Sequence, residues 1–316
     1  MIGRICGTGS YVPENYLDNH DIAKLVDTSD EWIQERTGII RRHIAKDDTT
    51  VSMAVKAAKA AMENGKINAE EIDLILVATI TPNFVIPGMA YEVQKEIGAV
   101  NAAAFDMSAA CSGFVFAYNT AQVYMVAEIY KTVLVIGSEC LSNIVNWEDR
   151  GSCILFGDGA GAAILRAEEG EILPFVMHSD GTKGNVLACE SRHQKNWEEK
   201  DTLMSMDGKE VFKFAVKKVP EVIDELLAKA NCTEEEIDWF ILHQANQRII
   251  ESVAKRMKVD IKKFPMNISE YGNTSSASIP ILLDEMNRSG KLQKGQKVVL
   301  AGFGAGLSWG ASLVEI

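Results

Sequence analysis

Hydrophobic and polar positions follow two patterns that alternate along the chain. Continuous apolar runs at 133–137 and 297–301 are typical of buried strands. Apolar residues at helical spacing predict amphipathic helices over 51–63 and 219–231, and a more uniformly apolar stretch from Phe114 to about Tyr130 predicts a buried helix. Strands that alternate with helices indicate a mixed α/β architecture in which helices cover sheets.

Three segments of the first half have counterparts, in the same order, in the second half. The pairs are 68–77 with 233–242, 106–108 with 267–269, and 156–165 with 302–311. Matches in a conserved order indicate a duplication.

The duplication divides the chain into two related halves, residues 1–168 and 169–316. The boundary is expected near 167–171, where charged residues and Gly170 interrupt the apolar runs. Residues 179–208 are polar and irregular, so we expect a surface insertion that borders the active site.

Composition limits the classes of function. The chain has 316 residues, of which 47% are hydrophobic, enough for a large core or two fused ones. Its net charge of -12 argues against nucleic acid or anionic lipid as a partner held by bulk attraction. There is no apolar signal core at the N-terminus and no run of 18 apolar residues, so no membrane association is expected.

The six cysteines point to a reducing compartment and to no metal site. None forms a CxxC pair, and none combines with histidine at zinc-ligand spacing. We therefore expect a cytoplasmic protein whose thiols are free by default.

Cys111 is the strongest candidate nucleophile. Small residues flank it, and the apolar helical pattern follows directly, which places it near a helix N-terminus. The unpaired N–H groups and the positive end of the helix dipole stabilise a thiolate there. We expect the pKa of Cys111 to lie below the free value of about 8.5. The alternative is a buried cysteine that packs as a small hydrophobe.

His243 and Asn273 are the other candidates in the second half. His243 lies where a buried strand ends and a helix begins, a common place for site residues in α/β folds. Asn273 follows Gly272 at a turn, and the duplication predicts that it occupies the position that Cys111 has in the first half. The alternatives are a core histidine and a helix N-cap asparagine, and Asn246 too could be only an N-cap.

The glycine-rich segment 302–310 allows backbone N–H groups to approach a ligand closely. It lacks the full dinucleotide fingerprint, and the chain has no Walker motif.

Together these segments resemble β-ketoacyl-acyl carrier protein synthase III, a family of thiolase-fold condensing enzymes, over nearly the whole chain. The matching motifs are Asp30-Glu31-Trp32-Ile33 with Arg36-Thr37-Gly38-Ile39, Ala110-Cys111-Ser112-Gly113, His243-Gln244-Ala245-Asn246, Tyr271-Gly272-Asn273-Thr274-Ser275 and Gly304-Ala305-Gly306-Leu307-Ser308-Trp309-Gly310. The resemblance implies an α/β fold of the thiolase-like kind, a duplicated α-β-α-β-α structure in five layers, and a homodimer.

The resemblance implies a two-stage acyl transfer that initiates type II fatty acid biosynthesis. Cys111 takes the acyl group of an acyl-CoA primer, with acetyl-CoA expected, and malonyl-acyl carrier protein then loses carbon dioxide and attacks the acyl-enzyme. His243 and Asn273 would donate hydrogen bonds to the enolate, while the backbone N–H groups of Cys111 and Gly306 would form an oxyanion hole. CoA thioesters are substrates, and no cofactor or metal is implied.

Binding residues for CoA follow from the same resemblance, and those for the carrier protein from basic residues at helical spacing after His243. Those implied for CoA are Trp32, Arg36, Arg150, Phe212 and Asn246. Those expected to dock the acidic carrier protein are Lys213, Arg248, Lys255 and Arg256, because an acidic chain needs a local basic patch. The alternative for Trp32 is an ordinary core aromatic, and for Arg36 and Arg150 it is a surface ion pair. For the basic residues of the docking surface it is a solvated helix face.

Ile86 is the candidate residue for primer choice. The segment 83–88 resembles a loop that crosses the dimer interface and lines the partner's acyl pocket, and Ile86 stands where acetyl-preferring members often have phenylalanine. We expect acetyl-CoA to be accepted and short branched primers to fit as well.

Other functions differ in what they require. A degradative thiolase needs a second cysteine near the C-terminal glycine loop, and none follows Cys232. A plant-type polyketide synthase is usually longer, whereas a secondary-metabolite synthase of the same branch stays open. Cysteine, histidine and asparagine also form the site of cysteine hydrolases. A catalytically silent heterodimer partner would not need to retain Cys111, His243 and Asn273.

Overall fold

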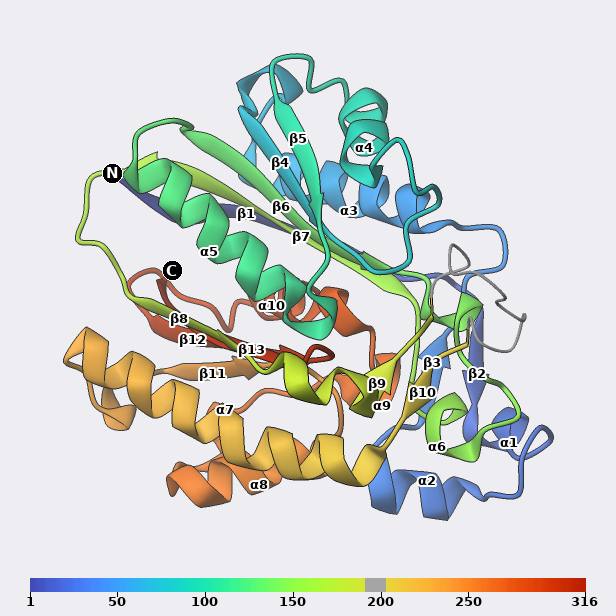
Figure 1. The fold of residues 1–316 in the computed structure, drawn as a ribbon. Coiled ribbons are helices and arrows are strands. Elements are labelled where there is room, and N and C mark those ends of the chain that lie inside the picture. The colour runs from blue at the N-terminus through green and yellow to red at the C-terminus, as the bar shows by residue number, and fades with distance from the viewer. Residues whose placement is uncertain (191–202) are drawn as a thin grey trace.

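The computed structural model describes residues 1–190 and 203–316, in which two mixed β-sheets are flanked by helices (Figure 1). The first sheet has the order β1 (Ile2–Tyr11), β7 (Gly159–Glu168), β6 (Thr132–Glu139), β4 (Leu74–Ala78), β5 (Ala103–Met107). The second has the order β11 (Trp239–Leu242), β12 (Lys297–Gly304), β13 (Ser308–Glu315), β8 (Phe175–Ser179).

The helices and small ribbons connect these strands. The α-helices are α1 (Asn19–Ile22), α2 (Asp30–Thr37), α3 (Thr50–Gly65), α4 (Met89–Ile97), α5 (Gly113–Val126), α6 (Arg150–Cys153), α7 (Gly208–Ala230), α8 (Gln247–Met257), α9 (Ile268–Tyr271) and α10 (Ser278–Arg288). The ribbons pair β2 (Tyr16–Asp18) with β3 (Arg41–His43) and β9 (Leu187–Ala188) with β10 (Ser205–Met206).

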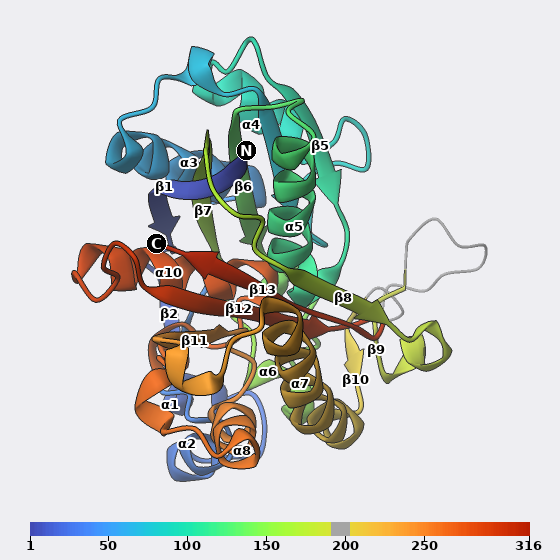
Figure 2. The same ribbon diagram turned by 90° about the vertical axis from the view of Figure 1, so that its left-hand side faces the viewer.

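Alternating side chains on the strands produce five layers. On β4, Ile75 and Val77 pack with α3 and α4, whereas Leu74 and Leu76 face α5 and α10. The other side of α5 and α10 covers the second sheet, whose far face packs on α7 and α8. The two central helices therefore lie between the sheets (Figure 1), and Figure 2 shows the same layers from the side. This is the predicted five-layered thiolase-like fold.

Most predicted elements are present, with shifted ends. The strands over 133–137 and 297–301 extend to β6 and β12, and the helix over 51–63 is α3. The helix expected to run to Tyr130 ends at Val126, because Glu128 turns the chain with a positive φ of 59°. Helix α7 begins well before the predicted residue 219, because the Asp207 carboxylate caps its first turn.

The structure corrects the register of the duplication. Both β4 and β11 follow a short 3₁₀ turn, η1 (Ala69–Glu71) or η6 (Glu234–Glu236), as the first sequence pair predicted. Two further 3₁₀ turns, η2 (Ala110–Ser112) and η8 (Ser275–Ala277), lead into the central helices, and each starts with a residue of positive φ.

Cys111 and Ser276 are the middle residues of η2 and η8, so these two positions correspond. The prediction that Asn273 occupies the position of Cys111 is therefore wrong, because the short pair 106–108 and 267–269 was aligned out of register. The third sequence match, 156–165 with 302–311, is also out of register. In the first sheet Gly161 lies opposite Gly137, and in the second sheet Gly310 lies opposite Gly302, so Gly161 corresponds to Gly310.

The region 179–208 is more regular than expected in its described part. Turn η4 (Gly181–Val186) leads into β9, which pairs with β10, and residues 191–202 lie outside the described residues.

Strand β7 ends at Glu168 and β8 begins at Phe175, on either side of the boundary at 168/169, which stays a prediction. Within the described ranges, no helix is both long and apolar enough to cross a membrane.

Candidate active site

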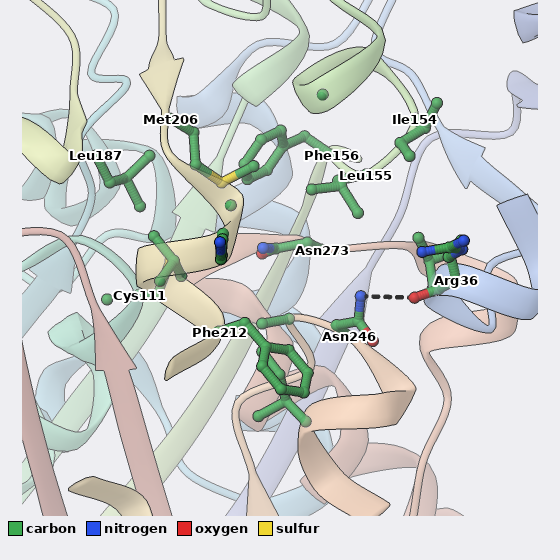
Figure 3. Close-up of a pocket in the computed structure, with 18 of the residues that line it drawn as sticks. Arg36, Cys111, Ile154, Leu155, Phe156, Leu187, Met206, Phe212, Asn246 and Asn273 are labelled. Atoms are coloured by element: carbon green, nitrogen blue, oxygen red, sulfur yellow. Dashed lines mark hydrogen bonds between the residues drawn. The ribbon is translucent and has the colours of Figure 1, made fainter. Parts of the chain in front are cut away.

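A cavity of about 640 Å³ brings most of the predicted site residues together (Figure 3). Its buried end holds Cys111 from η2, His243 from the end of β11 and Asn273 from the turn before η8. The volume is typical of a small-molecule site. The sheets thus place groups from both halves of the chain at one point, at the contact between η2 and η8.

Cys111 lies where the sequence predicted, just before the first turn of α5, but its electrostatics differ. Burial raises the pKa of the Cys111 thiol to about 12, a shift that a hydrogen bond with Ser275 opposes and the charge of Glu139 reinforces. The expected lowering by the helix N-terminus is therefore wrong. Desolvation outweighs the helix dipole because the side chain is 7% exposed.

Gly304, at the end of β12, is in close contact with the nucleophile. A Cβ at this position would lie 2.8 Å from Cys111 Cβ and 3.3 Å from its Sγ. Only glycine leaves room for the thiol there. Sequence reasoning marked the glycine-rich segment but could not identify which glycine meets Cys111.

His243 is neutral and oriented by one hydrogen bond. Burial lowers the pKa of His243 to about 3. Its Nδ1 lies 2.7 Å from Ser278 Oγ, which accepts the backbone N–H of Gln244 at 3.3 Å. This arrangement is satisfied when the Ser278 hydroxyl donates to Nδ1, which leaves the proton on Nε2 as the donor available to the cavity.

Asn273 is fixed through its backbone and its side-chain oxygen. Its N–H donates to Leu155 O at 2.8 Å, and its carbonyl accepts Gly157 N–H at 3.0 Å. Its Oδ1 accepts Ser275 N–H at 2.9 Å, so the Nδ2 amino group is the end that can donate to a ligand.

The outer end of the cavity combines an aromatic ring with two guanidinium groups. Arg36 and Arg150 lie 5.6 and 4.9 Å from the centre of the Trp32 ring. Arg150 also donates to Asp27 O at 3.0 Å. Such a group presents a flat stacking surface beside positive charge, which suits a phosphorylated nucleotide.

Phe212 and Asn246 also line this cavity, and Figure 3 shows Asn246 beside Arg36. Asn246 is the N-cap of α8, since its Oδ1 accepts Arg248 N–H at 2.8 Å, and its Nδ2 donates to Arg36 O at 3.0 Å. The structure thus gives Asn246 the capping role that was its alternative, and its part in ligand binding stays a prediction.

The four basic residues expected at the docking surface are exposed on the adjacent helices α7 and α8. Lys213 forms an ion pair with Glu210 at 2.7 Å. Arg256 donates to Val216 O at 3.2 Å, whereas Arg248 and Lys255 project from α8. Carrier docking by these side chains stays a prediction.

A second cavity of about 50 Å³ also has Cys111 in its lining, and sequence reasoning missed it. Its apolar lining includes Ile80, Leu141, Phe156, Leu187 and Met204, which come from five separate segments of the chain. No local pattern could have connected them.

Two predicted residues, Gly306 and Ile86, do not line either cavity within one chain. Gly306 is not among the residues that line either cavity, whereas its neighbours Gly304 and Ala305 are. Ile86 is 84% exposed in a run with Phe84 and Val85, which are 54% and 72% exposed. Its predicted contact with the acyl pocket of a second copy stays a prediction.

The described residues contain no group of three histidine, cysteine, aspartate or glutamate side chains that could hold a metal ion.

Comparison with known proteins gives one consistent family. Residues 105–181 match the model of 3-oxoacyl-[acyl-carrier-protein] synthase III, and residues 227–316 match the model of its C-terminal part. The beta-ketoacyl-[acyl-carrier-protein] synthase III of Clostridium novyi (strain NT) is 49% identical over 99% of this chain and 98% of its own length.

Solved structures agree over the whole length. The 3-oxoacyl-[acyl-carrier-protein] synthase III of Aquifex aeolicus VF5 is 44% identical, with a TM-score of 0.94 over 99% of this chain and 100% of that one. The priming beta-ketosynthase from the R1128 polyketide biosynthetic pathway is 36% identical, with a TM-score of 0.95 over 100% of this chain and 96% of that one.

The contact between Gly304 and Cys111 predicts the effect of a single methyl group. In Gly304→Ala, overpacking should cost about 1–3 kcal/mol in the free energy of unfolding and slow the alkylation of Cys111 by iodoacetamide. Urea unfolding and mass spectrometry of the Cys111 peptide measure the two effects. Gly208→Ala is the matched control, because Gly208 also lines the cavity but its added carbon would have 3.7 Å to Met206 Cε. Alkylation of Gly304→Ala at the wild-type rate would contradict the prediction.

Proposed function

The chain belongs to the 3-oxoacyl-[acyl-carrier-protein] synthase III family, and we propose that it joins a short acyl-CoA primer to malonyl-acyl carrier protein by decarboxylative Claisen condensation. The products are 3-ketoacyl-acyl carrier protein, CoA and carbon dioxide, and the reaction initiates type II fatty acid biosynthesis. One observation carries the proposal: Cys111, His243 and Asn273 lie at the buried end of the same cavity whose outer end holds Trp32, with the guanidinium groups of Arg36 and Arg150 at 5.6 and 4.9 Å from its ring centre.

In the first stage Cys111 Sγ attacks the thioester carbonyl of the primer. The Cys111 S–H bond breaks, a new thioester forms, and CoA leaves with a proton as the free thiol. Because burial keeps the resting thiol protonated, the proton must leave as the substrate binds. Backbone N–H groups near Cys111 can stabilise the tetrahedral oxygen. For this role, residues Gly304 and Ala305 are better placed than Gly306, since they line the cavities that contain Cys111.

In the second stage malonyl-acyl carrier protein loses carbon dioxide, and its thioester becomes an enolate. Nε2 of His243 and Nδ2 of Asn273 donate hydrogen bonds to the enolate oxygen. The carbanion attacks the acyl-enzyme carbonyl, the carbon–sulfur bond to Cys111 breaks, and the thiolate takes up one proton. These two donors are neutral, so they stabilise the developing charge without binding the malonyl carboxylate as an ion pair. The reaction requires no metal or redox cofactor.

CoA fits the outer part of the cavity. The adenine would stack on Trp32 after displacing the Arg150 guanidinium from the ring face, and Arg36 and Arg150 would meet its phosphates. The pantetheine arm would then pass Phe212 and Asn246 on its way to Cys111. Exposed Arg248, Lys255, Arg256 and Lys213 would receive the acidic carrier protein near the same entrance.

The small apolar cavity would take the acyl chain of the primer. Its volume of about 50 Å³ suits a short chain. The exposed run of Phe84, Val85 and Ile86 supports a homodimer in which this loop is covered by a second copy and lines that copy's acyl pocket. We place the reaction in the cytoplasm, where cysteines such as Cys111 and Cys140 remain thiols.

The condensation itself is directly measurable. Wild-type protein incubated with acetyl-CoA and malonyl-acyl carrier protein should yield 3-ketobutyryl-acyl carrier protein by intact mass. Cys111→Ser should form neither the acyl-enzyme nor the product. Asn273→Ala should still be acylated but should condense at least about 100-fold more slowly, as for loss of one oxyanion donor. Acylation of the wild type without product would instead indicate a different extender.

The neutral state of His243 predicts the acid limb of the pH profile. The pKa of His243 is lowered to about 3, so the imidazole stays neutral throughout pH 8 to 5, and it gains a proton only below that window. Decarboxylation of malonyl-acyl carrier protein by the acylated enzyme should therefore not fall with a midpoint near pH 6.5. Stopped-time assays of carbon dioxide release across this range measure it. A loss centred near the ordinary histidine pKa would contradict the prediction.

A condensing enzyme of secondary metabolism is the second candidate, because the priming polyketide ketosynthase has the same fold at a TM-score of 0.95. Primer choice separates the two. The small cavity and Ile86 predict a kcat/KM within about tenfold for acetyl-, butyryl- and isobutyryl-CoA. A strict preference for acetyl-CoA would contradict the broader pocket. Rejection of acetyl-CoA in favour of longer primers would favour the second candidate.

A further inference from the structure

Glu139 is a buried carboxylate beside the active site that the proposed reaction does not use. It is the last residue of β6, and its side chain is 0% exposed. Oε2 accepts hydrogen bonds from Thr81 Oγ1 at 2.7 Å, Ile80 N at 3.1 Å and Thr79 Oγ1 at 3.2 Å. Oε1 lies 2.9 Å from Ser276 Oγ and 3.3 Å from Ser275 Oγ. Burial raises the pKa of the Glu139 carboxyl, and these hydrogen bonds oppose that shift by stabilising the ionised form.

The duplication shows what this side chain replaces. Strands β6 and β12 are each eight residues long and end at Glu139 and Gly304, and Ser276 is the counterpart of Cys111. In one half, Gly304 has no side chain and leaves space for the thiol of Cys111. In the other half, the carboxylate of Glu139 fills the corresponding space and binds Ser276. The two halves therefore use the same position in opposite ways.

Glu139 connects to two groups of the proposed machinery through Ser275. Ser275 N–H donates to Asn273 Oδ1 at 2.9 Å and thereby orients the Asn273 amide. The Ser275 hydroxyl contacts Cys111 as well as Glu139, and both Ser275 and Cys111 line the small cavity. Ser275 has a φ of 50°, a strained conformation for a residue with a side chain, which its neighbours must hold in place.

We propose that Glu139 is a positioning residue for condensation: by binding the hydroxyls of Ser275 and Ser276, it fixes the turn that presents Asn273 and the hydroxyl that faces Cys111. This inference deepens the proposed function and rests on it. The carboxylate is anchored on its other side to Thr79, Ile80 and Thr81, so it ties the end of β4 in the first half to η8 in the second.

Glu139 and Ser275 affect the pKa of Cys111 in opposite directions, which a purely structural contact would not do. The main cause of the high pKa of Cys111 is burial; beyond that, the Ser275 hydrogen bond lowers the pKa of Cys111 and the charge of Glu139 raises it. Removal of the charge and removal of the hydroxyl should therefore shift the thiolate fraction in opposite directions. Glu139 also raises the pKa of Cys140, for which burial is again the main cause, so alkylation must be measured on the Cys111 peptide alone.

Glu139→Gln tests the proposal with two readouts on the full chain. The amide keeps the shape of the side chain but replaces one accepting oxygen with a donor that faces other donors. Condensation of acetyl-CoA with malonyl-acyl carrier protein should lose at least about tenfold in kcat, because Asn273 is misplaced, while kcat/KM for acetyl-CoA, which reports only the acylation stage, should stay unchanged. Alkylation of Cys111 by iodoacetamide at pH 8 should become faster, because a neighbouring negative charge is gone.

Ser275→Ala should change the alkylation rate of Cys111 in the opposite direction. It should also lower kcat, but it should slow the alkylation of Cys111, and it decides the question if Glu139→Gln does not fold. Asp284→Asn is the matched control: Asp284 is a buried carboxylate on α10 that binds Thr8 and Ser10, and its neutralisation should leave both readouts at wild-type values.

Wild-type condensation in Glu139→Gln, or alkylation shifts of the same sign in Glu139→Gln and Ser275→Ala, would overturn the proposal. Failure of the proposed function would look different, because the wild type would then give no condensation product. The alkylation rates of the two variants would still decide the role of Glu139 in that case.

Discussion

Two short helical turns, η2 and η8, meet at the centre of the molecule, and the positions of Cys111 and Asn273 depend on that contact. Each turn begins with a residue of positive φ, Ala110 or Ser275, which unsupported backbone would avoid. Glycines at matching positions let the partner turn approach: a Cβ on Gly137 would lie 2.3 Å from Ser276 O, and one on Gly302 would lie 3.1 Å from Ser112 Cα. Close packing of the two halves therefore fixes a strained geometry that neither half would keep alone.

Burial at this contact also sets the protonation states. Desolvation raises the pKa of the Cys111 thiol and lowers that of His243, so both groups are neutral near pH 7. A buried ion pair between them would carry a desolvation penalty from both charges. A neutral site suits a reaction in which negative charge appears only on the substrate, because uncharged donors then stabilise that charge when it forms.

The site is asymmetric because the two halves of the duplicated fold differ at the corresponding positions. A symmetric pair of turns would create two equivalent sites, yet only one holds a thiol. The other holds Ser276, and the Glu139 carboxylate fills the space beside it. At the corresponding position beside Cys111, Gly304 has no side chain and leaves that space open. One half thus supplies the nucleophile and the support, and the other supplies His243, Asn273 and the space in which Cys111 reacts.

The sequence by itself determined the layered α/β class, the main strands and helices, the family and the nucleophile, because these follow from local periodicity and short contiguous motifs. Only the tertiary structure decided the register of the two halves, since the matching segments are too short to align without their strand pairing. It also decided the direction of the Cys111 pKa shift, the glycine that contacts the thiol, the small apolar cavity and the position of Glu139. Each of these depends on burial or on contacts between segments far apart in the chain, and neither is encoded in any single stretch of residues.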